Sequence, residues 1–473
     1  MPPRDHDISS RASTANNDGW ENNEERVVMI PAGKENRHHD MEQTMVQLQN
    51  GEYLHLPITG RMDRYLEEHV PCIRRANERL MATHGIDIIA DDGSSTTKSS
   101  HKLLSSKNNN NNSNKMKKMN RTVLNILQGE MAHAASSDVD ILVSDDATTC
   151  HILAVRSYRV DTFSSTSTAA SSDTTVVPHQ DQGMDALVSM AHIDSIGYDA
   201  DLDDMMREHV TYHHQNQQQQ QQQESSSSTN TLLLRMDVHI MGGFDDDDDE
   251  GEEGSSLVIT HYLLRQLSKL AAGSSHHPNS SRIQIQMILH TCAATCMNTK
   301  YDDGHHNNIN RNISRNRNMP LSRGFAMEVA SGRIFRAHMN MNNNNNSATD
   351  PASSLFPYTT LRSCRIFCEE YDDALSIIHR PGDRGAVRIA PFRFVHHPNL
   401  DALISSSSSI AIPDAMLLQL VSTSPHAEGG SFCDNFRKSV RYLKEHTWME
   451  VFGPGCDVPV VHRRRSNAVC VAY

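Results

Sequence analysis

Apolar and polar residues alternate with a period of two along several segments of the chain, which is the pattern of half-buried β-strands. The clearest segment runs from Leu232 to Ile240 and ends at Gly242-Gly243. Asn50-Gly51 and Ser331-Gly332 predict hairpins between neighbouring strands. Together the patterns predict strands at 46–48, 53–56, 123–127, 139–143, 150–155, 188–194, 232–240, 283–289, 325–329, 334–335, 366–367 and 387–389.

Other segments repeat apolar residues every three to four positions, which is typical of amphipathic helices. They predict one helix through Met62, Leu66 and Val70, which Pro71 interrupts, and another through Leu202, Met205, Met206 and Val210. A third helix is expected from an N-cap at Ser256 to a stop at Gly273. The last is expected from a cap at Ser431 through Phe432, Phe436, Val440 and Leu443. Many strands with a few interspersed helices predict the α+β class, as a strand-rich domain with a few packed helices and long low-complexity loop insertions.

Homopolymer tracts of Asn, Gln, Asp and Ser interrupt this 473-residue chain. Such tracts bury little apolar surface, so they are expected to form flexible loop insertions. The expected insertions lie near 91–119, 162–185, 213–230, 245–255, 302–318, 340–352 and 404–410. We therefore predict one domain over 45–462, a disordered extension over 1–43 and a C-terminal tail over 463–473.

Charge and cysteine content exclude several classes of protein. The net charge of −14 argues against a general nucleic-acid or membrane-surface binder. Nine cysteines, an odd and scattered set, do not predict a disulfide framework, so reduced thiols in an intracellular compartment are expected. The start of the chain has no apolar signal region and no segment approaches the ~18 apolar residues of a membrane span, which predicts a soluble, non-secreted protein.

Cys150 is the strongest candidate for a reactive group. It enters the apolar run 151–155 directly after two carboxylates and two hydroxyls, residues that a core strand would not choose. The alternative is a buried free cysteine that packs as a small apolar side chain. Since Asp145 and Asp146 would raise the pKa of the thiol, a nucleophilic role needs help from a histidine.

Among 28 histidines, His192 has the best placement for that role. It lies on the strand after Cys150. Asp194 follows two positions later on the same face and is a candidate to orient the imidazole, although side chains two positions apart on one strand diverge. His151 is adjacent to Cys150, so on a strand it is expected to point to the opposite face.

Three further patterns have competing interpretations. Cys292/Cys296 and Cys364/Cys368 have a spacing that permits a four-thiolate zinc site, but strand-like surroundings disfavour it and no metal is predicted. Gly242-Gly243 lacks the features of a phosphate-binding loop and predicts a turn. Residues 422–428 fit a capping turn and a substrate-contacting loop about equally well.

Three segments together resemble the protein N-terminal asparagine amidohydrolases of eukaryotes. They are Ser-Asp-Asp-Ala-Thr-Thr-Cys-His at 144–151, His-Ile-Met-Gly-Gly-Phe at 239–244, and Ser-Thr-Ser-Pro-His-Ala-Glu at 422–428 before the Phe-rich helix. Weaker matches are 191–195, 389–392 and the hairpin around Gly51. The resemblance runs, with insertions, over 45–462, and the first segment is highly specific. The chain departs from the family in its N-terminal extension and in the insertion between Cys150 and His192, so the role of His192 depends on treating 162–185 as inserted.

The resemblance implies hydrolysis of the side-chain amide of an N-terminal Asn to Asp and ammonia, with Cys150 as nucleophile and no cofactor. The product would be arginylated and would mark the protein for ubiquitin-dependent degradation, which places the enzyme in the cytoplasm and also in the nucleus. Its partners would be proteins or peptides with a free N-terminal Asn, and we expect a monomer. A weaker analogy links it to bacterial glutamine deamidases that use a Cys–His pair.

A mechanism built on these residues assigns proton transfer to His192 and oxyanion stabilisation to Thr149, with Thr148 and nearby backbone N–H groups. The free α-ammonium of the substrate calls for carboxylates, which Asp145, Asp146 or Glu428 supply. Ser424 is a further candidate for substrate contact.

Two other functions stay open at this stage. One is a degradation adaptor that binds N-terminal residues without reaction, which would have no need of Cys150. The other is an internal glutamine deamidase, which would still act on a substrate with a blocked N-terminus.

Overall fold

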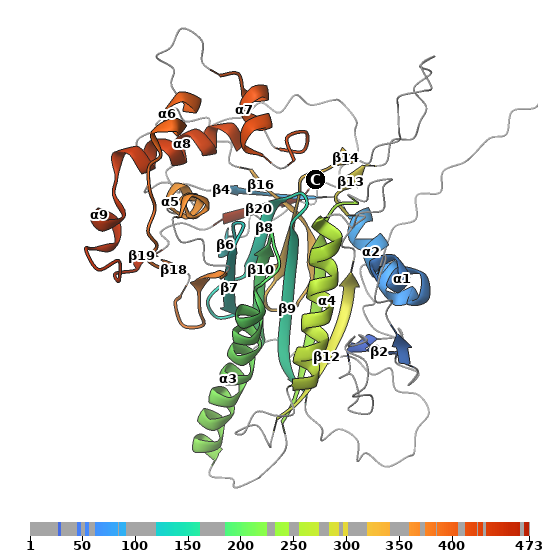
Figure 1. Ribbon diagram of the computed structural model, residues 1–473. Helices are drawn as coiled ribbons and strands as arrows, with labels where there is room; N and C mark the ends of the chain where they lie inside the picture. Colours follow the sequence, from blue (N-terminus) through green and yellow to red (C-terminus); the bar gives the residue numbers. More distant parts are fainter. Residues whose placement is uncertain are drawn as a thin grey trace, which may run out of the picture.

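Two stacked β-sheets, with helices over the outer face of the larger sheet, make up the body of the protein (Figure 1). In the computed structural model, the described residues are 27–29, 45–48, 53–55, 62–83, 85–90, 120–160, 185–224, 232–245, 255–273, 283–292, 297–300, 319–340, 359–368, 374–384, 386–404, 412–422, 424–428, 432–463 and 468–472.

The larger sheet has nine strands and carries the centre of the fold. Its order is β17 (Ser376–His379), β7 (Glu130–Ala135), β10 (Leu187–Ile193), β9 (His151–Val160), β11 (Leu232–Gly242), β12 (Ile283–Cys292), β1 (Val27–Met29), β2 (Met45–Leu48) and β3 (Tyr53–His55). The long central strand β9 runs antiparallel to both neighbours, with Ile152 opposite His192 and Leu153 opposite Ala191. This register sets which side chains share a face.

The smaller sheet has seven strands. Its order is β5 (Asn120–Arg121), β20 (Ala468–Ala472), β4 (Ile86–Ala90), β16 (Ile334–Asn340), β15 (Arg323–Glu328), β8 (Ile141–Ala147) and β6 (Val123–Asn125). Two short pairs, β13 (Thr299–Lys300) with β14 (Met319–Pro320) and β18 (Ala386–Ile389) with β19 (Val460–Arg463), lie beside the sheets. The chain crosses from the smaller to the larger sheet between β8 and β9, directly through Cys150.

The helices form two groups. The first group covers the larger sheet and comprises α1 (Met62–His69), α2 (Pro71–Ala82), α3 (Asp199–Glu224) and α4 (Ser255–Gly273) (Figure 1). The second gathers at one end and comprises α5 (Thr359–Ser363), the 3-10 turn η5 (Cys364–Phe367), α6 (Pro398–Ile404), α7 (Asp414–Val421), α8 (Phe432–Glu445) and α9 (Trp448–Phe452). Among the described residues, no helix is both long and apolar enough to cross a membrane.

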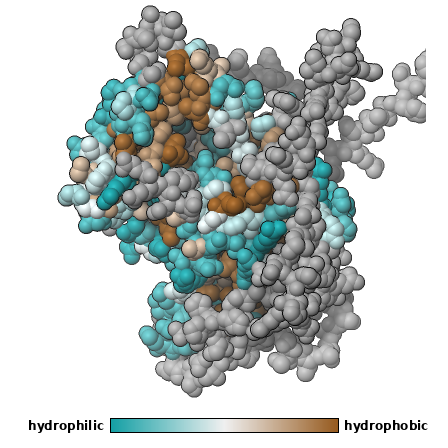
Figure 2. Space-filling model, in the orientation of Figure 1, coloured by the Kyte–Doolittle hydropathy of each residue, from teal (hydrophilic) through white to brown (hydrophobic). Residues whose placement is uncertain are grey.

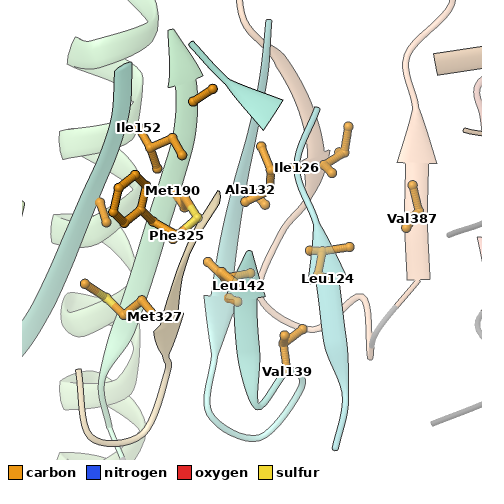
Figure 3. Packing of buried hydrophobic residues seen from close by; sticks show 14 of the residues in the cluster. Leu124, Ile126, Ala132, Val139, Leu142, Ile152, Met190, Phe325, Met327 and Val387 are labelled. Carbon is orange, nitrogen blue, oxygen red and sulfur yellow. The ribbon is translucent and has the colours of Figure 1, made fainter. Parts of the chain in front are cut away.

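The alternation of side chains along β9 divides the interior into two cores. Leu153 and Val155 face the helices, whereas Ile152 and Ala154 face the smaller sheet. Figure 3 shows the core between the sheets, where Ile152 and Met190 pack near Phe325 and Met327. Because both faces of β9 are buried, its sequence is a continuous apolar run up to Val155 and does not alternate with polar residues.

Apolar surface is concentrated over the second helix group (Figure 2). On α7, Met416 and Leu420 are 55% and 56% exposed, while Leu417 between them is fully buried against α8. The spacing of four residues places the two exposed side chains on the outer side of the helix.

The structure confirms the α+β class and most of the predicted elements. The strands that flank Asn50-Gly51 pair as β2 and β3, and those that flank Ser331-Gly332 pair as β15 and β16. Pro71 separates α1 from α2 and is the first residue of the second helix. Most of the predicted insertions lie outside the described residues, as does the Ser431 cap. Within the predicted extension over 1–43 the structure describes β1, which pairs with β12 and β2 in the larger sheet. Within the predicted tail over 463–473 it describes β20, which pairs with β4 and β5 in the smaller sheet.

Three expectations were wrong. The glutamine tract continues α3 to Glu224, because Gln is a good helix former and Gln220 bonds Arg159 and Asp185 on the sheet side. Residues 366–367 belong to a 3-10 turn, since a short apolar run does not distinguish strand from turn. Ser256 lies inside α4, and its hydroxyl binds the loop before Cys150 instead of capping the helix.

Candidate functional site

Cys150 lies in the tight turn between β8 and β9 and is 9% exposed. Its carbonyl accepts a hydrogen bond of 2.9 Å from the Gly243 amide. A Cβ atom on Gly242 would come within 2.7 Å of the same carbonyl, and Gly242 has φ 89°. The Gly242-Gly243 turn is therefore the surface against which the cysteine turn packs, and any side chain there would displace it.

Two side chains hold the carbonyls of the cysteine turn. The Asn298 side-chain amide donates to the carbonyls of Ala147 (2.8 Å) and Thr148 (3.0 Å), and Asn298 is fully buried. The Ser256 hydroxyl donates to the Thr149 carbonyl at 3.0 Å. Three consecutive carbonyls are thus bound, which fixes the backbone that carries Cys150.

His192 lies on the same face of the larger sheet as Cys150. Ile152 is paired with His192 and packs in the core between the sheets, so His192 faces that core too. Two residues before Ile152, Cys150 faces the same way and lies one diagonal step from His192. Diagonal neighbours on adjacent strands are roughly 7 to 8 Å apart at Cα, within reach of long side chains.

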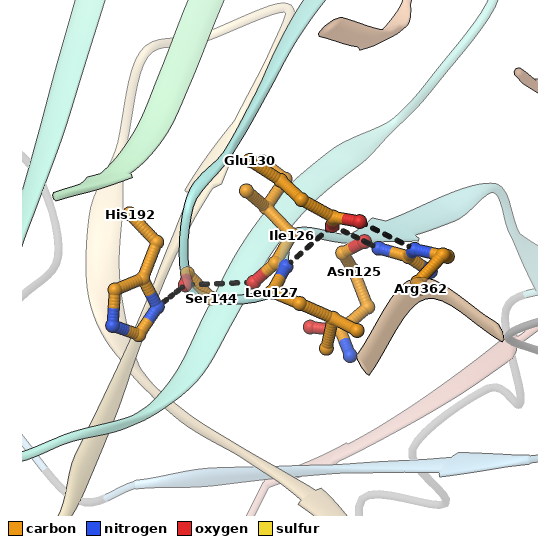
Figure 4. Close-up of polar contacts among 7 residues, drawn as sticks. All are labelled: Asn125, Ile126, Leu127, Glu130, Ser144, His192 and Arg362. Carbon is orange, nitrogen blue, oxygen red and sulfur yellow. Dashed lines mark hydrogen bonds and ion pairs between the residues drawn. The ribbon is translucent and has the colours of Figure 1, made fainter. Parts of the chain in front are cut away.

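Ser144 on β8 fixes the proton of the His192 ring (Figure 4). Its hydroxyl donates to the Ile126 carbonyl at 2.8 Å and lies 2.8 Å from Nδ1 of His192. Because a hydroxyl has one proton, the histidine must donate from Nδ1. Nε2 is then the unprotonated nitrogen, and it is buried without a hydrogen-bond partner.

The cysteine and the histidine are both neutral at rest. Burial raises the pKa of the Cys150 thiol to about 12, and the charges of Asp194 and Glu428 add to this, whereas a hydrogen bond from Thr149 opposes it. Burial also lowers the pKa of His192 to about 4, although Asp194, Glu130 and Asp145 oppose the shift. The site therefore holds a thiol beside an acceptor nitrogen, and not a preformed ion pair.

Asp146 and Glu428 bring negative charge to the same site from distant parts of the chain. Asp146 has φ 58°, an uncommon conformation for a residue other than Gly, and its side chain reaches solvent. Desolvation, the charge of Asp145 and, to a smaller extent, the charge of Glu428 raise the pKa of Asp146 to about 6, against a hydrogen bond from Ser322. The pKa of Glu428 is itself raised by burial.

Two other predicted residues are already engaged in structure. One oxygen of the Asp145 carboxylate accepts from the Met339 amide at 2.6 Å, and the other accepts from the Asp146 amide at 2.9 Å. Ser424 is buried in a turn where its amide donates to the Ser422 hydroxyl at 2.9 Å. The same Ser422 hydroxyl donates to Glu428 at 2.5 Å, so Ser422 orients Glu428 at the end of the turn over 424–428.

His151 and Asp194 have partners other than the catalytic candidates. Nε2 of His151 lies 2.8 Å from the Thr260 hydroxyl on α4, on the helix side of the sheet as expected. Asp194 accepts from Gln128 (2.7 Å) and from Tyr198 (2.6 Å). Ser144 is therefore the group that contacts Nδ1 of the His192 ring, whereas Asp194 acts on the ring through its charge.

The cysteine pairs of the zinc hypothesis lie in different elements. Cys292 ends β12, Cys364 begins η5, and Cys296 is outside the described residues. Within the part of the chain that the structure describes, no group of three or more His, Cys, Asp or Glu side chains is arranged to hold a metal ion.

Ser144 and Asn298 are site residues for which the sequence suggested no role. Ser144 had a local signal, since it is a polar residue on the buried face of an apolar strand, six positions before Cys150. Asn298 had none, because its contacts cross about 150 positions of the chain.

Comparison with known proteins identifies the family of the chain. The family model described as protein N-terminal asparagine amidohydrolase matches residues 112–470, which include Cys150, His192, Asn298 and Glu428. A search of curated proteins found no match. Since the family model covers most of the chain and all of the site, the chain belongs to the protein N-terminal asparagine amidohydrolase family.

Proposed function

We propose that this amidohydrolase acts through a thioester on Cys150, with His192 as the group that moves protons. The observation that carries the proposal is the buried, unpartnered Nε2 of His192 on the sheet face of Cys150. A buried nitrogen without a partner is costly, and a thiol or substrate proton would satisfy it.

The reaction has two halves. His192 Nε2 takes the thiol proton as the sulfur attacks the side-chain amide carbon of the N-terminal Asn, and the new imidazolium then protonates the leaving nitrogen as ammonia. Water next attacks the thioester, with the same imidazole as base, and the C–S bond breaks to give N-terminal Asp and free Cys150. Because both groups are neutral at rest, proton transfer must accompany the attack.

The oxyanion would form beside the donors that surround the sulfur. The Thr149 side chain and the Cys150 amide both act on the thiol as hydrogen-bond donors. The bonds that Asn298 and Ser256 make to the carbonyls of the turn fix the backbone that carries these donors. Fixed donors at a developing negative charge are a large source of rate acceleration.

Recognition of the free α-ammonium is assigned to Asp146 and Glu428. The charge of Glu428 acts on both Asp146 and Cys150. Like charges held together without a cation raise each other's pKa, and a substrate ammonium between them would relieve the repulsion. Asp145 keeps its structural bonds in this scheme, and Ser424 acts through the turn that orients Glu428.

We further propose that the Asp product enters arginylation-dependent degradation in the cytoplasm and nucleus. Seven of the cysteines in the described residues are reduced, which supports a reducing compartment.

The test is ammonia release from a peptide that begins with Asn, beside its Gln-initiated and N-acetylated forms. We expect release from the free Asn peptide alone, and a loss of about four orders of magnitude or more in Cys150→Ala. Cys433→Ala, a buried cysteine on α8, is the matched control and should retain the wild-type rate.

Other outcomes would contradict the proposal in distinct ways. Binding of the Asn peptide without ammonia release would indicate an adaptor, and release from the acetylated peptide would indicate an internal deamidase. Full activity in Cys150→Ala would exclude the thioester.

A further inference from the structure

A fully buried ion pair lies behind the site, between Glu130 at the start of β7 and Arg362 on α5. The guanidinium binds both carboxylate oxygens, with 2.9 Å from Arg362 Nε to Glu130 Oε1, and the two side chains are 1% and 2% exposed. Removing both charges from water is costly, and apolar residues of similar size often replace such pairs without loss of stability. Stability alone is therefore a weak reason for this pair.

Both partners also bind the backbone of one short segment. Arg362 Nη2 donates to the Asn125 carbonyl at 2.7 Å, and the Leu127 amide donates to Glu130 at 2.8 Å. Ile126 lies between these two anchors and is fully buried. Its carbonyl is the acceptor for the Ser144 hydroxyl. The ion pair thus fixes the carbonyl that sets the direction of the Ser144 proton (Figure 4).

The same segment also holds the backbone of His192. Residues 127–130 form a tight turn in which the Glu130 amide donates to the Leu127 carbonyl at 3.0 Å. Gly129, with φ 72°, donates its amide to the His192 carbonyl at 3.0 Å. The ring and the backbone of His192 therefore both depend on the turn that Glu130 closes.

We propose that the Glu130–Arg362 ion pair is a positioning device that holds His192, through Ile126 and Ser144 and through Gly129, in the tautomer and place needed to accept a proton at Nε2. The inference rests on the proposed role of His192. Neither partner contacts Cys150 in this arrangement, so both are positioning residues and not catalytic ones.

Glu130 has an additional electrostatic effect on the imidazole. The charged groups that act on His192 are Asp194 just beyond its own strand, Glu130 on β7 and Asp145 on β8, and all three favour the protonated ring. Neutralising Glu130 removes one of them, so the pKa of His192 should fall. The acidic limb of the kcat profile should then move to lower pH, which a purely structural defect would not cause.

The first experiment compares Arg362→Lys with Arg437→Lys on α8. Arg437 makes the same two kinds of contact, to the Asp414 carboxylate (2.6 Å) and to the Ile412 carbonyl (3.3 Å), and these contacts do not lead to His192. Lysine keeps the charge but lacks the planar fork of donors with which arginine binds both carboxylate oxygens. We expect kcat for the Asn peptide to fall about 10- to 100-fold in Arg362→Lys with KM within twofold, and to change less than twofold in Arg437→Lys.

A second variant covers the case in which Arg362→Lys does not fold. Glu130→Gln with Arg362→Gln leaves no unpaired buried charge and retains hydrogen-bonding groups. We expect this double variant to fold, with a lower kcat and an acidic limb shifted to lower pH. A wild-type kcat and limb in the folded double variant, or an Arg362→Lys loss no greater than that of Arg437→Lys, would overturn the proposal.

Alkylation of Cys150 by iodoacetamide separates this inference from the proposed function. In that reaction the sulfur displaces iodide and the thiol proton passes to a base, so its rate reports on His192 without any substrate. Slower alkylation in Arg362→Lys than in Arg437→Lys, followed by mass spectrometry of the Cys150 peptide, supports positioning even if no ammonia is released from the Asn peptide. Equal rates in both variants would refute it.

Discussion

The two faces of the larger sheet carry the same chemical pair in different settings. On the face toward the smaller sheet, Ser144 contacts His192 at 2.8 Å. On the face toward the helices, the Ser157 hydroxyl contacts His209 at 2.6 Å and His213 at 2.8 Å. All five residues are buried.

The difference lies in what each histidine joins. His209 and His213 are on α3 and Ser157 is on β9, so their contacts attach a helix to the sheet. Ser144 receives the ring proton of a histidine that faces a cysteine turn. A Ser–His pair is therefore not an active site in itself. The surroundings of the imidazole nitrogen that the serine does not contact decide the role of the histidine.

Replacing the histidine on each face should give the largest contrast. We expect His192→Gln to lower kcat by roughly 10²- to 10⁴-fold, because it removes the proton acceptor. His209→Gln should keep kcat within about twofold and lower the free energy of unfolding by about 1 to 3 kcal/mol. Steady-state kinetics and urea unfolding measure both. Equal losses of kcat in the two variants would remove the distinction between the faces.

Replacing the serine on each face should give a smaller contrast. Ser144→Ala leaves the His192 ring free to exchange tautomers, so kcat should fall about 10- to 100-fold at unchanged KM. Ser157→Ala should lower the free energy of unfolding and leave kcat unchanged. Ser144→Thr, which restores the hydroxyl, should recover part of the rate. If threonine gives no recovery, the serine acts through packing and not through its hydrogen bond.

Asp146, near the cysteine turn, and Asp201, on α3, should differ in their effect on substrate binding. Since the pKa of Asp146 is raised to about 6, its carboxylate becomes protonated as pH falls through 6, and affinity for an ammonium should fall with it. We expect Asp146→Asn to raise KM roughly tenfold at pH 7.5 and to abolish the kcat/KM limb near pH 6. Asp201→Asn is the control, because burial also raises the pKa of this α3 residue. An unchanged KM in Asp146→Asn would assign the ammonium to other groups.

Buried histidines on the helix face should make the fold sensitive to acid. Burial is the main cause that lowers the pKa of His133 to about 3 and of His213 to about 4, so both stay neutral when folded, whereas the unfolded chain binds protons below about pH 6.5. Above pH 6.5 these histidines do not change the free energy of unfolding. As pH falls from 6.5 toward the folded pKa values, each histidine lowers the free energy of unfolding by about 1.4 kcal/mol per pH unit. Urea unfolding at pH 7.5 and 5.5 measures it. His133→Gln with His213→Gln should reduce the difference, and an unchanged difference would assign acid sensitivity to other residues.

Much of the fold was predictable because it follows local rules. The period of two along residues 232–240 became β11, and Asn50-Gly51 marked a true hairpin. The prediction of a loop for the glutamine tract was wrong because composition indicates only whether a segment can form a core by itself. Here the tract continues a helix whose earlier turns are already packed on the sheet. The 3-10 turn at Cys364–Phe367 was missed because a run of that length carries too little periodicity.

The sequence by itself determined the family, the polar turn that carries Cys150, and the opposite directions in which Cys150 and His151 point. These depend on neighbouring residues and on the alternation along a strand. Tertiary structure decided which groups complete the site: Ser144 at Nδ1 of His192, Asn298 on the cysteine turn, and Glu428, whose charge acts on Asp146. These partners lie 48 to 151 positions apart where a hydrogen bond joins them, and local patterns do not encode which strands and loops meet across the two sheets.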